Sequence, residues 1–533
     1  MAHRYRLGIV PRRTRPAPHS WTDWVRLTLV VVLVAGAVTG FFTREWRQRM
    51  FTCNEGGPSA EAWRVGDRCI GLSDGPYAFE LDRFGAVMRV IDAQNRTAGD
   101  DCAAEPVTVG VLLTMSDPLA GSRAVHELEG MAAGQRRTNT EACHRPIRLL
   151  VGQLGDYDGD GDPVAVAAAM AAREDVVAVA GIGLSHHATA EIANLLAAAK
   201  IPMVSDVVTA EGFDQDGSQN DDPDFERCDR SYADGIGRDY YYRIGFRVAV
   251  QVERIGATVP RPDFVMVPVG GSDPYTCTTL PLLQRRYGGG LAEVKFDTTE
   301  PSTVLQTARR VCAQRGKVVV AYIARGHDLG RLLTSLDDEY ARGQCVADSI
   351  TVISTSDGNR LRTAEIDPAL EHLRVAGLGS RSFTEGRVRV LFTLVAGTEG
   401  PRPGDGSWED FNSAFTGAGF DPDHIGDGWA INAYDAVLTI GQALREVPTT
   451  EPVRRGEINS VISGFSGGVS AVPGAGGPIA FDPSGNRTDI EPSVVRLCPR
   501  PAGTSPDALS HGSSSTVPVP PGAQEPPGCP PGA

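Results

Sequence analysis

The polar turn Ser-His-His-Ala-Thr at residues 185–189 carries the side chains best suited to hold a small charged ligand. The turn follows a valine-rich apolar run and precedes a helical pattern, so it is predicted to begin a helix. A helix amino terminus offers free N–H groups and the positive end of the helix dipole, and both suit a carboxylate. Ser185 and Thr189 would add hydroxyl donors to such a site, or they would only cap the helix.

The two histidines of this turn, His186 and His187, are adjacent in the sequence. On a helix adjacent side chains point about 100° apart, so the pair cannot share a metal ion in the usual i, i+4 manner. A histidine beside a ligand would make binding sensitive to pH. The alternative is that both are solvated surface residues, and the sequence leaves the two interpretations open.

Alternating aspartates form the one pattern that suggests a metal. Asp156, Asp158, Asp160 and Asp162 resemble the start of a calcium loop, but the position that requires an acid at its end is Ala167. The segment is therefore either an incomplete calcium loop or a solvated acidic loop. No CxxC or HxxxH spacing indicates zinc. We predict no cofactor and no metal site.

Signatures of catalysis are weak. The pattern G-x-S-x-G occurs around Ser73 and Ser466, but neither serine lies between a buried strand and a helix, as a nucleophile elbow requires. No P-loop and no HExxH motif is present. Without these catalytic motifs, the sequence favours a binding protein over an enzyme.

The elements that position these residues form two alternating strand and helix series. Four apolar, β-branched runs in the first half alternate with helical patterns, and a second such series follows. The predicted strands lie at 107–115, 147–154, 176–183 and 203–208, and then at 264–269, 292–296, 318–324 and 350–355. Strands that are apolar at nearly every position are buried on both faces, which predicts parallel sheets covered by helices. In such sheets ligands bind at the carboxyl ends of the strands.

The amino terminus predicts a membrane anchor. Residues 1–50 contain nine arginines against Asp23 and Glu45, and residues 27–42 are apolar without a charge. Residues 24–42 are roughly long enough to cross a bilayer, and the arginines before them place the amino terminus in the cytoplasm and the remainder outside. A cleaved signal peptide, cut after a shorter apolar core near residues 35–37, is the alternative.

The charge and the cysteines fit an exported protein. Although residues 1–50 are basic, the whole chain has a formal net charge of −15, so the large part beyond them is acidic and is not expected to bind nucleic acid. All ten cysteines follow the apolar segment, and an even number in an exported chain indicates disulfides. The expected strand positions suggest the pairs Cys102 with Cys143 and Cys312 with Cys345, and Cys53 with Cys69 would close a small loop.

Four segments, in order, resemble a known family. They are VGVLLTMSDPLAG … GMAAGQRRTN from 109, GIGLSHHATAEIANLLAAAKIPMVSDVVT from 181, WAINAYDAVLTIGQAL from 429 and GGPIAFDPSGNR from 476. Together they resemble the substrate-binding proteins of branched-chain amino acid ABC transporters, which have the type I periplasmic binding-protein fold. The resemblance covers roughly residues 105–500. It implies two doubly wound α/β lobes, joined by three crossovers, that close on a small polar ligand.

The resemblance also implies a set of ligand contacts. Thr209 matches a second ligand loop, and Asp273 and Tyr275 match an Asp…Tyr pair after the first strand of the other lobe, although Tyr275 would equally pack at the rim. Asp357 ends a further strand, where an acid would pair with a ligand amine. The full predicted set is Thr114, Ser116, Ser185, His186, His187, Thr189, Thr209, Asp273, Tyr275, Ser356 and Asp357.

These patterns predict a single-pass, outward-facing solute-binding protein for an amino-acid-like ligand. It would deliver the ligand to an ABC permease or act as a sensor with a signalling partner in the envelope; the alternative is an interaction protein that has lost its ligand. The expected organisation is a cytoplasmic tail (1–23), an anchor (24–42), a stalk and leader helix (43–104), lobe 1 (105–240 and 357–447), lobe 2 (241–356 and 448–498) and a disordered tail rich in Pro, Gly and Ser (499–533).

Overall fold

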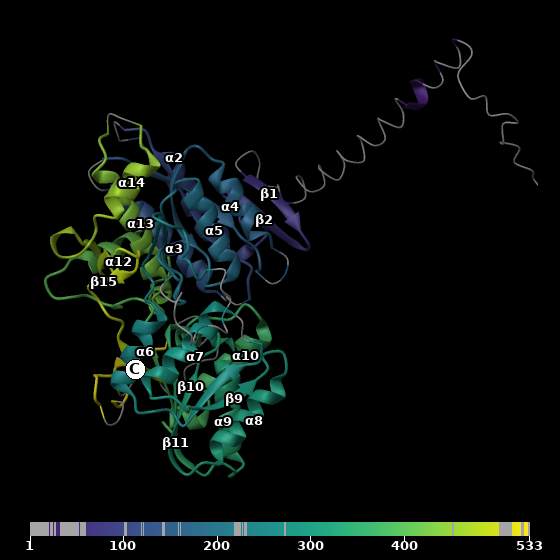
Figure 1. Ribbon diagram of the computed structural model, residues 1–533, viewed down its shortest axis with the longest axis vertical. Helices are drawn as coiled ribbons and strands as arrows, with labels where there is room; N and C mark the ends of the chain where they lie inside the picture. The colour runs from purple at the N-terminus through teal and green to yellow at the C-terminus, as the bar shows by residue number, and fades with distance from the viewer. Residues whose placement is uncertain are drawn as a thin grey trace, which may run out of the picture.

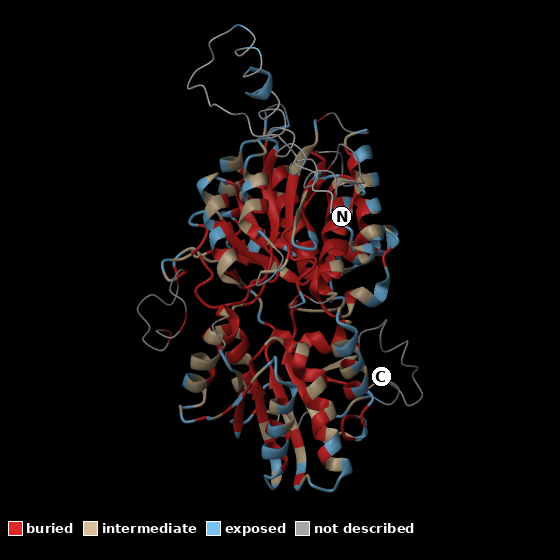
Figure 2. Cartoon of the chain, turned by 90° about the vertical axis from the view of Figure 1, so that its right-hand side faces the viewer, coloured by how far each residue is buried: buried red, intermediate tan, exposed pale blue. Residues whose placement is uncertain are grey.

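The computed structural model shows two α/β lobes stacked along the long axis of the molecule (Figure 1). The described residues are 21, 25, 28–31, 53, 60–100, 104–118, 120, 122–140, 144–157, 159, 161–217, 225, 228, 232–270, 273–449, 452–499, 514–523 and 527–530. Buried residues concentrate on the two sheets and on the inner faces of the helices that cover them (Figure 2).

Lobe 1 is built on a seven-stranded sheet with the order β1-β2-β4-β3-β5-β6-β7. Its strands are β1 (Ala60–Val65), β2 (Arg68–Ser73), β3 (Val107–Leu113), β4 (Ile147–Gln153), β5 (Val176–Ile182), β6 (Met203–Ser205) and β7 (Tyr241–Arg243). Strands β3 to β7 are parallel, as predicted. Strands β1 and β2 form an antiparallel hairpin at one edge.

Helices cover both faces of this sheet. One face packs on α2 (Gly85–Thr97), α3 (Arg123–Thr140) and α13 (Trp429–Arg445), and the other on α4 (Pro163–Ala171) and α5 (His187–Ala198). Helices α12 (Ser407–Gly417) and α14 (Arg455–Ile462) and the small sheet of β13 (Val472–Gly474), β14 (Gly477–Phe481) and β15 (Arg487–Thr488) also join this lobe.

Lobe 2 has a second seven-stranded sheet with the order β17-β16-β12-β11-β10-β8-β9. Its strands are β8 (Phe264–Pro268), β9 (Ala292–Phe296), β10 (Gly316–Tyr322), β11 (Ala347–Ser354), β12 (Val388–Thr393), β16 (Val494–Leu497) and β17 (Thr516–Pro518). Helices α6 (Val248–Thr258) and α7 (Pro274–Arg286) cover one face. Helices α8 (Pro301–Cys312), α9 (Leu329–Ala341), α10 (Pro368–Leu378) and α11 (Arg381–Thr384) lie on the other side.

The chain passes between the lobes three times: after β7, after β12 and before β16. This corrects two predicted boundaries. Residues 357–393 belong to lobe 2, because β12 pairs with β11, and the segment with α14 and β13–β15 belongs to lobe 1, because it packs in the lobe 1 core. The last strand that the sequence predicts in lobe 2 is 350–355. The run that forms β12 comes after α10 and α11, so the sequence places it wrongly in lobe 1.

Both ends of the chain contribute more structure than predicted. The predicted stalk and leader helix, 43–104, contain β1 and β2, which were not predicted and extend the lobe 1 sheet, and α2, which is the predicted helix and packs on the sheet. The predicted disordered tail, 499–533, contains β17, which pairs with β16. The tail is rich in Pro and Gly, but a short edge strand needs hydrogen bonds on one side only, and proline is tolerated there.

Four disulfides join described cysteines: Cys53–Cys69, Cys228–Cys277, Cys312–Cys345 and Cys498–Cys529. The predicted pairs Cys53–Cys69 and Cys312–Cys345 are confirmed. Cys102 and Cys143 lie outside the described residues. The Cys228–Cys277 disulfide connects the lobes, since Cys228 lies between β6 and β7 of lobe 1 and Cys277 lies in α7 of lobe 2.

The predicted anchor, 24–42, falls mostly outside the described residues, which include only Val25 and 28–31 of that range. Within the part of the chain that the structure describes, no helix combines the length and the apolar composition that a membrane crossing requires.

Candidate functional site

The carboxyl ends of the parallel strands in both lobes face each other, so the loops after them meet between the lobes. Lobe 1 contributes the loops after β3, β5 and β6, and lobe 2 contributes the loops after β8, β10 and β11. We call this region the interlobe site. Figure 1 shows the two lobes and the stretch of chain between them.

Arg325, which follows β10, is one of the side chains that join the two lobes at this site. Its guanidinium Nη2 donates to the backbone carbonyl of Ser185 in lobe 1 (2.8 Å) and to Asp273 Oδ1 in lobe 2 (2.7 Å). Nη1 lies 3.6 Å from Asp357 Oδ2, and the guanidinium carbon lies 4.6 Å from the centre of the Tyr275 ring. Burial lowers the pKa of Arg325, but the charges of Asp273 and Asp357 raise it by more, so the pKa lies above its usual value. Arg325 therefore stays positively charged.

The predicted turn at 185–189 lies where it was expected, at the amino terminus of α5. The Ser185 hydroxyl accepts hydrogen bonds from the backbone amides of Thr209 (3.0 Å) and Ala210 (3.1 Å), which ties the loops after β5 and β6 together. Thr189 donates to the Leu184 carbonyl and is hydrogen bonded to Tyr157 (2.9 Å). The hydroxyls of Ser185 and Thr189 therefore fix the shape of the wall of lobe 1.

The two histidines occupy different positions. His186 is the N-cap residue of α5: its Nδ1 accepts a hydrogen bond from the Ala188 amide (3.3 Å), and its ring stacks on Tyr157 with 4.3 Å between ring centres. The ring of His187 is tilted against Tyr232, 6.3 Å away. Both side chains are half-buried, so neither is a fully solvated surface residue.

The loop after β3, which contains the predicted contacts Thr114 and Ser116, is fixed by hydrogen bonds within lobe 1. The Ser116 hydroxyl donates to Asp156 Oδ1 (2.7 Å) and accepts from the Gln153 side chain (2.9 Å), and Thr114 is also buried. Asp162 caps α4 through the Ala165 amide. Two of the four aspartates of the calcium-like pattern thus have structural contacts, and the other two, Asp158 and Asp160, lie outside the described residues.

The lobe 2 residues gather around Arg325. Asp273 caps α7 by accepting from the Tyr275 and Thr276 amides. The Tyr275 hydroxyl is hydrogen bonded to Thr355, and burial raises the pKa of Tyr275 well above its usual value. The Ser356 amide donates to Gln251 (2.8 Å) and Asp357 is buried. Tyr275 is fully buried beside Arg325 and is not a rim residue.

Three residues at this site were not predicted from the sequence: Arg325, Arg123 and Trp429. Arg325 directly follows a predicted strand, as Ser356 does, so the same rule of strand ends would have found it. Trp429 packs with Leu184 and Val207 in a small apolar cluster at the interlobe site. The guanidinium carbon of Arg123 lies 4.7 Å from the centre of the Trp429 ring. These two residues come from helices distant in sequence, and the spacing of neither one predicts the contact.

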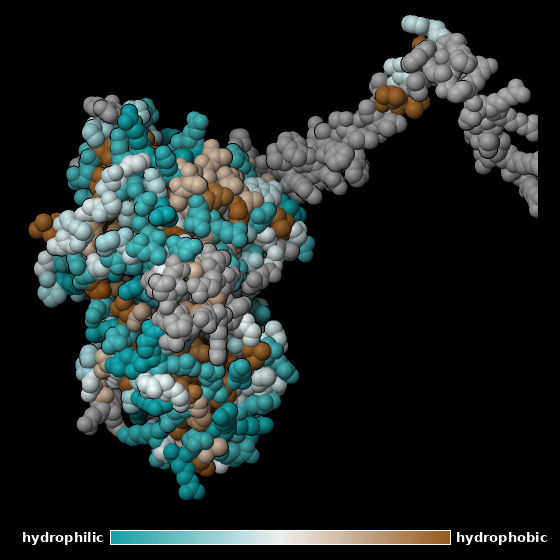
Figure 3. All heavy atoms as spheres, in the orientation of Figure 1, coloured by the Kyte–Doolittle hydropathy of each residue, from teal (hydrophilic) through white to brown (hydrophobic). Residues whose placement is uncertain are grey.

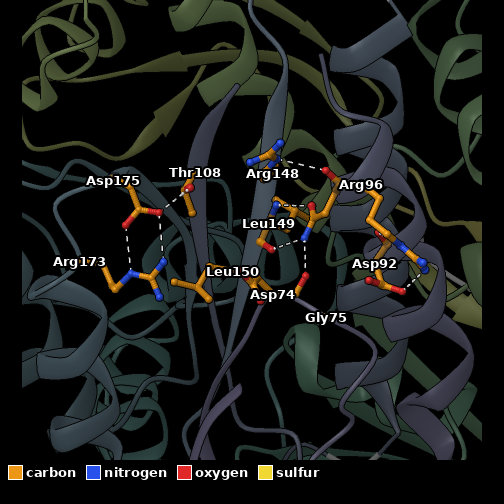
Figure 4. Close-up of a pocket in the computed structure, with 11 residues that line it drawn as sticks. Asp74, Gly75, Asp92, Arg96, Thr108, Arg148, Leu149, Leu150, Arg173 and Asp175 are labelled. Atoms are coloured by element: carbon orange, nitrogen blue, oxygen red, sulfur yellow. Dashed lines mark hydrogen bonds and ion pairs between the residues drawn. The ribbon is translucent and has the colours of Figure 1, made fainter. Parts of the chain in front are cut away.

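A separate cavity of about 540 Å³ lies at the opposite end of the lobe 1 sheet, near the amino ends of its parallel strands (Figure 4). Its most prominent charges pair with each other: Arg173 with Asp175, which also accepts from Thr108, and Arg96 with Asp92. None of the predicted ligand contacts lines it. Among the described residues, the metal-like cluster of Cys53, Cys69 and Glu80 contains a disulfide and not two free thiols.

Comparison with solved structures identifies the fold. The chain superposes on the branched-chain amino acid transporter substrate-binding protein LivJ from Streptococcus pneumoniae in complex with isoleucine (TM-score 0.53, 15% identity), over 78% of this chain and 99% of that one. It also superposes on a solute-binding protein of an ABC transporter from R. palustris in complex with 4-hydroxybenzoate (TM-score 0.52, 14% identity), over 78% of this chain and 96% of that one. A third match is a type 1 periplasmic binding protein from Bordetella pertussis (TM-score 0.52, 12% identity), over 78% of this chain and 100% of that one.

No family model matches the chain, and no curated protein matches its sequence. The structural likeness at this low identity shows the fold, which is the type I periplasmic binding-protein fold that the sequence motifs predicted.

Proposed function

We propose that this chain, which has the type I periplasmic binding-protein fold, is an outward-facing solute-binding protein that closes its two lobes on a small polar ligand. The similar structures are described as substrate-binding proteins, two of them in complex with a small carboxylate-bearing molecule, which supports binding as the function and not catalysis. The ligand that the interlobe site suits best is amino-acid-like.

The position of Arg325 carries this proposal. An arginine that is only 12% exposed and reaches from one lobe to the wall of the other is placed to bind an anionic group when the lobes close. The amino terminus of α5 faces the same region, because the carbonyl that Arg325 contacts belongs to Ser185, one residue before the N-cap residue. A ligand carboxylate between Arg325 and α5 would gain from both.

The opposite charge is available beside it. Asp357 is buried, and its Oδ2 has no hydrogen-bond partner among the described residues, although Arg325 lies 3.6 Å away. A ligand ammonium would pair with this oxygen. Thr114, Ser116, Thr209, Tyr275 and Ser356 would then line the site and hold its shape, and His186 would close one side through its stacking on Tyr157.

Export and anchoring form the second part of the proposal. Four disulfides support folding in an oxidising compartment. The arginine-rich amino terminus followed by an apolar run supports a single-pass anchor with the lobes outside the cell. A protein held in this way would hand its ligand to an ABC permease or report it to a signalling partner in the envelope.

Calorimetric titration of the full-length chain with single compounds tests the proposal. The panel contains isoleucine, lysine, glutamate and 4-hydroxybenzoate, so that amine, charge and apolar body vary separately. We expect micromolar or tighter binding of at least one member, and a rise in melting temperature with that compound. Absence of binding across amino acids and organic acids would contradict a solute-binding role.

One observation favours an alternative, an interaction protein that has lost its ligand. The groups expected to face a ligand already bond to each other: Ser185 to Thr209, Tyr275 to Thr355, and Asp273 to Arg325. In that case the lobes would stay closed without a ligand. Small-angle scattering of the ligand-free chain separates the two, because a solute-binding protein opens in solution and a permanently closed protein does not.

A further inference from the structure

Five buried side chains of lobe 1 lie beside the interlobe site, and several of their polar atoms make no hydrogen bond to the described residues. They are Arg123 and Glu127 of α3, Asp206 directly after β6, and Trp429 and Asn432 of α13, and we call them the polar cluster. Arg123 Nε lies 3.2 Å from Glu127 Oε1, and Arg123 also lies over the Trp429 ring. The Asn432 side-chain amide donates to the backbone carbonyls of Asp206 and Val395 (both 3.2 Å).

The polar cluster is adjacent to the ligand wall. Val207, next to Asp206 in the chain, packs with Leu184, Val395 and Trp429 in the apolar cluster of the interlobe site. The charges of Asp357 and Arg325, both in lobe 2, act on Arg123 across the lobe boundary. The cluster therefore lies within electrostatic reach of the residues to which we assign the ligand carboxylate and amine.

Several polar atoms in the cluster lack a hydrogen-bond partner among the described residues. These are both carboxylate oxygens of Asp206, Asn432 Oδ1, Trp429 Nε1 and Arg123 Nη2, while Arg123 Nε and Glu127 Oε1 have only their mutual ion pair. Native proteins leave few buried polar groups unpaired, and each such group calls for a partner such as water or a ligand. Acceptors outnumber donors here, so the missing partner is chiefly a hydrogen-bond donor.

The charges in the cluster point the same way. With both carboxylates ionised, Glu127 and Asp206 outnumber Arg123 by one negative charge. Burial and the nearby charge of Glu127 raise the pKa of Asp206 well above its usual value, while the backbone amides of Asp206 and Val207 lower it by less. Burial therefore favours the protonated form of Asp206, and a cation beside it would favour the ionised form.

Resting on the proposed function, we infer that the interlobe site selects ligands with a second amine, such as a basic amino acid, whose distal ammonium is bound by Asp206 and Glu127 beside Trp429. The α-carboxylate and α-amine would be bound by Arg325 and Asp357. The methylene stem of the ligand would lie on Leu184, Val207 and Val395, since flexible amine side chains bury their stems on apolar surfaces. The Arg123–Trp429 contact shows that this indole accepts a cation.

The test compares lysine with norleucine, which has the same methylene stem without the distal amine. By calorimetric titration of the full-length chain, lysine binds at least tenfold more tightly than norleucine, which corresponds to about 1.4 kcal/mol. The Asp206→Asn variant keeps the shape of the side chain but loses the negative charge, and it reduces the preference for lysine to less than threefold. Glu127→Gln reduces it in the same direction.

Asp92→Asn, in the separate cavity of lobe 1, is the matched control and leaves the preference unchanged. Thermal unfolding of each variant confirms that it is folded. Equal or tighter binding of norleucine in the unmodified chain overturns the inference and leaves the proposed function standing. An unchanged preference for lysine over norleucine in folded Asp206→Asn also overturns the inference. Water, and not a ligand amine, would then be the hydrogen-bond partner of the polar cluster. Failure of every panel compound to bind overturns both.

Discussion

Arg325 of lobe 2 donates a hydrogen bond to the backbone carbonyl of Ser185 in lobe 1, 2.8 Å away. The contact joins the residue that follows β10 to the turn before α5, so each sheet contributes the carboxyl end of one of its central strands. Because a backbone carbonyl accepts this bond, the contact depends on the position of the turn and not on the identity of the side chain at 185.

Replacing Arg325 with alanine is expected to weaken ligand binding by about 10- to 100-fold, or about 1.4–2.7 kcal/mol. The variant loses the cation that binds the ligand carboxylate and leaves Asp273 and Asp357 beside each other without it. Calorimetric titration with the compound that binds the unmodified chain measures the change. Arg381→Ala removes an exposed arginine that also has a carboxylate partner, and it should bind normally. Equal affinity in both variants would remove Arg325 from the ligand site.

The Cys228–Cys277 disulfide is expected to limit how far the lobes open. The double variant Cys228→Ser/Cys277→Ser should have a larger radius of gyration without ligand and a faster ligand dissociation rate. Loss of a cross-link between cysteines 49 positions apart in the sequence should also lower stability by roughly 4 kcal/mol. X-ray scattering and stopped-flow measurements report the first two effects.

Cys312→Ser/Cys345→Ser serves as the control, because that disulfide lies wholly within lobe 2 and spans a similar separation of 33 residues. It should lower stability by a comparable amount and leave the radius of gyration and the dissociation rate as they are. If both double variants, or neither of them, expand the ligand-free protein, the disulfide between the lobes does not restrain opening.

Strands β3 to β6 and β8 to β11 were predictable because a strand buried on both faces tends to have a continuous apolar run, whereas the parallel strands β7 and β12 were not predicted. The carboxyl ends of the predicted strands indicated Ser185 and Asp357, the family resemblance indicated Tyr275, and the structure places all three next to Arg325 at the boundary between the lobes. The edge strands were not predictable in the same way. In β1, the sequence AEAWRV has one solvated edge, and its burial is partial, so its pattern is close to that of a loop.

The roles of individual side chains were harder to predict than their positions. The sequence left open whether the Ser185 hydroxyl contacts a ligand or caps the helix, and it did not predict that this oxygen accepts hydrogen bonds from the backbone amides of Thr209 and Ala210. The Arg123–Trp429 contact joins residues about 300 positions apart, and it depends on how α3 and α13 pack. Periodicity describes which face of a helix is buried, and it does not specify which helix covers that face.

The packing of α3 on α13 gives a third prediction. A Cβ atom added at Gly130 would lie 2.1 Å from the backbone carbonyl oxygen of Ala430, so Gly130 allows the two helices to approach closely. Gly130→Ala should therefore destabilise the protein by about 1–3 kcal/mol or more, despite the better helix propensity of alanine. Gly456→Ala is the matched control, since a Cβ there in α14 meets nothing within 4 Å and should be neutral or stabilising. Urea unfolding measures both, and a neutral Gly130→Ala would mean that the helices can separate at little cost.

His424 gives the protein a stability that depends on pH. Its Nδ1 lies 2.7 Å from Glu129 Oε2 of α3, and its ring stacks on His126 with 4.1 Å between centres. Burial lowers the pKa of His424, but the hydrogen bond and charge of Glu129, with the charges of Asp427 and Asp421, raise it above 6.5 overall. The folded state therefore binds this proton more tightly than the unfolded chain does. The resulting stabilisation is complete below pH 6.5 and disappears as the pH rises through the pKa of the folded state.

The unmodified chain should accordingly lose stability as the pH rises from 6 towards 8, and His424→Gln should lose much less. Urea unfolding at half-unit steps between pH 5.5 and 8.5 gives the two curves, which should differ most at the acidic end. His372→Gln, at an exposed position of α10, controls for the loss of a histidine as such and should follow the unmodified chain. Parallel curves for His424→Gln and the unmodified chain would show that the Glu129–His424 pair is equally protonated in the folded and unfolded states, contrary to its geometry.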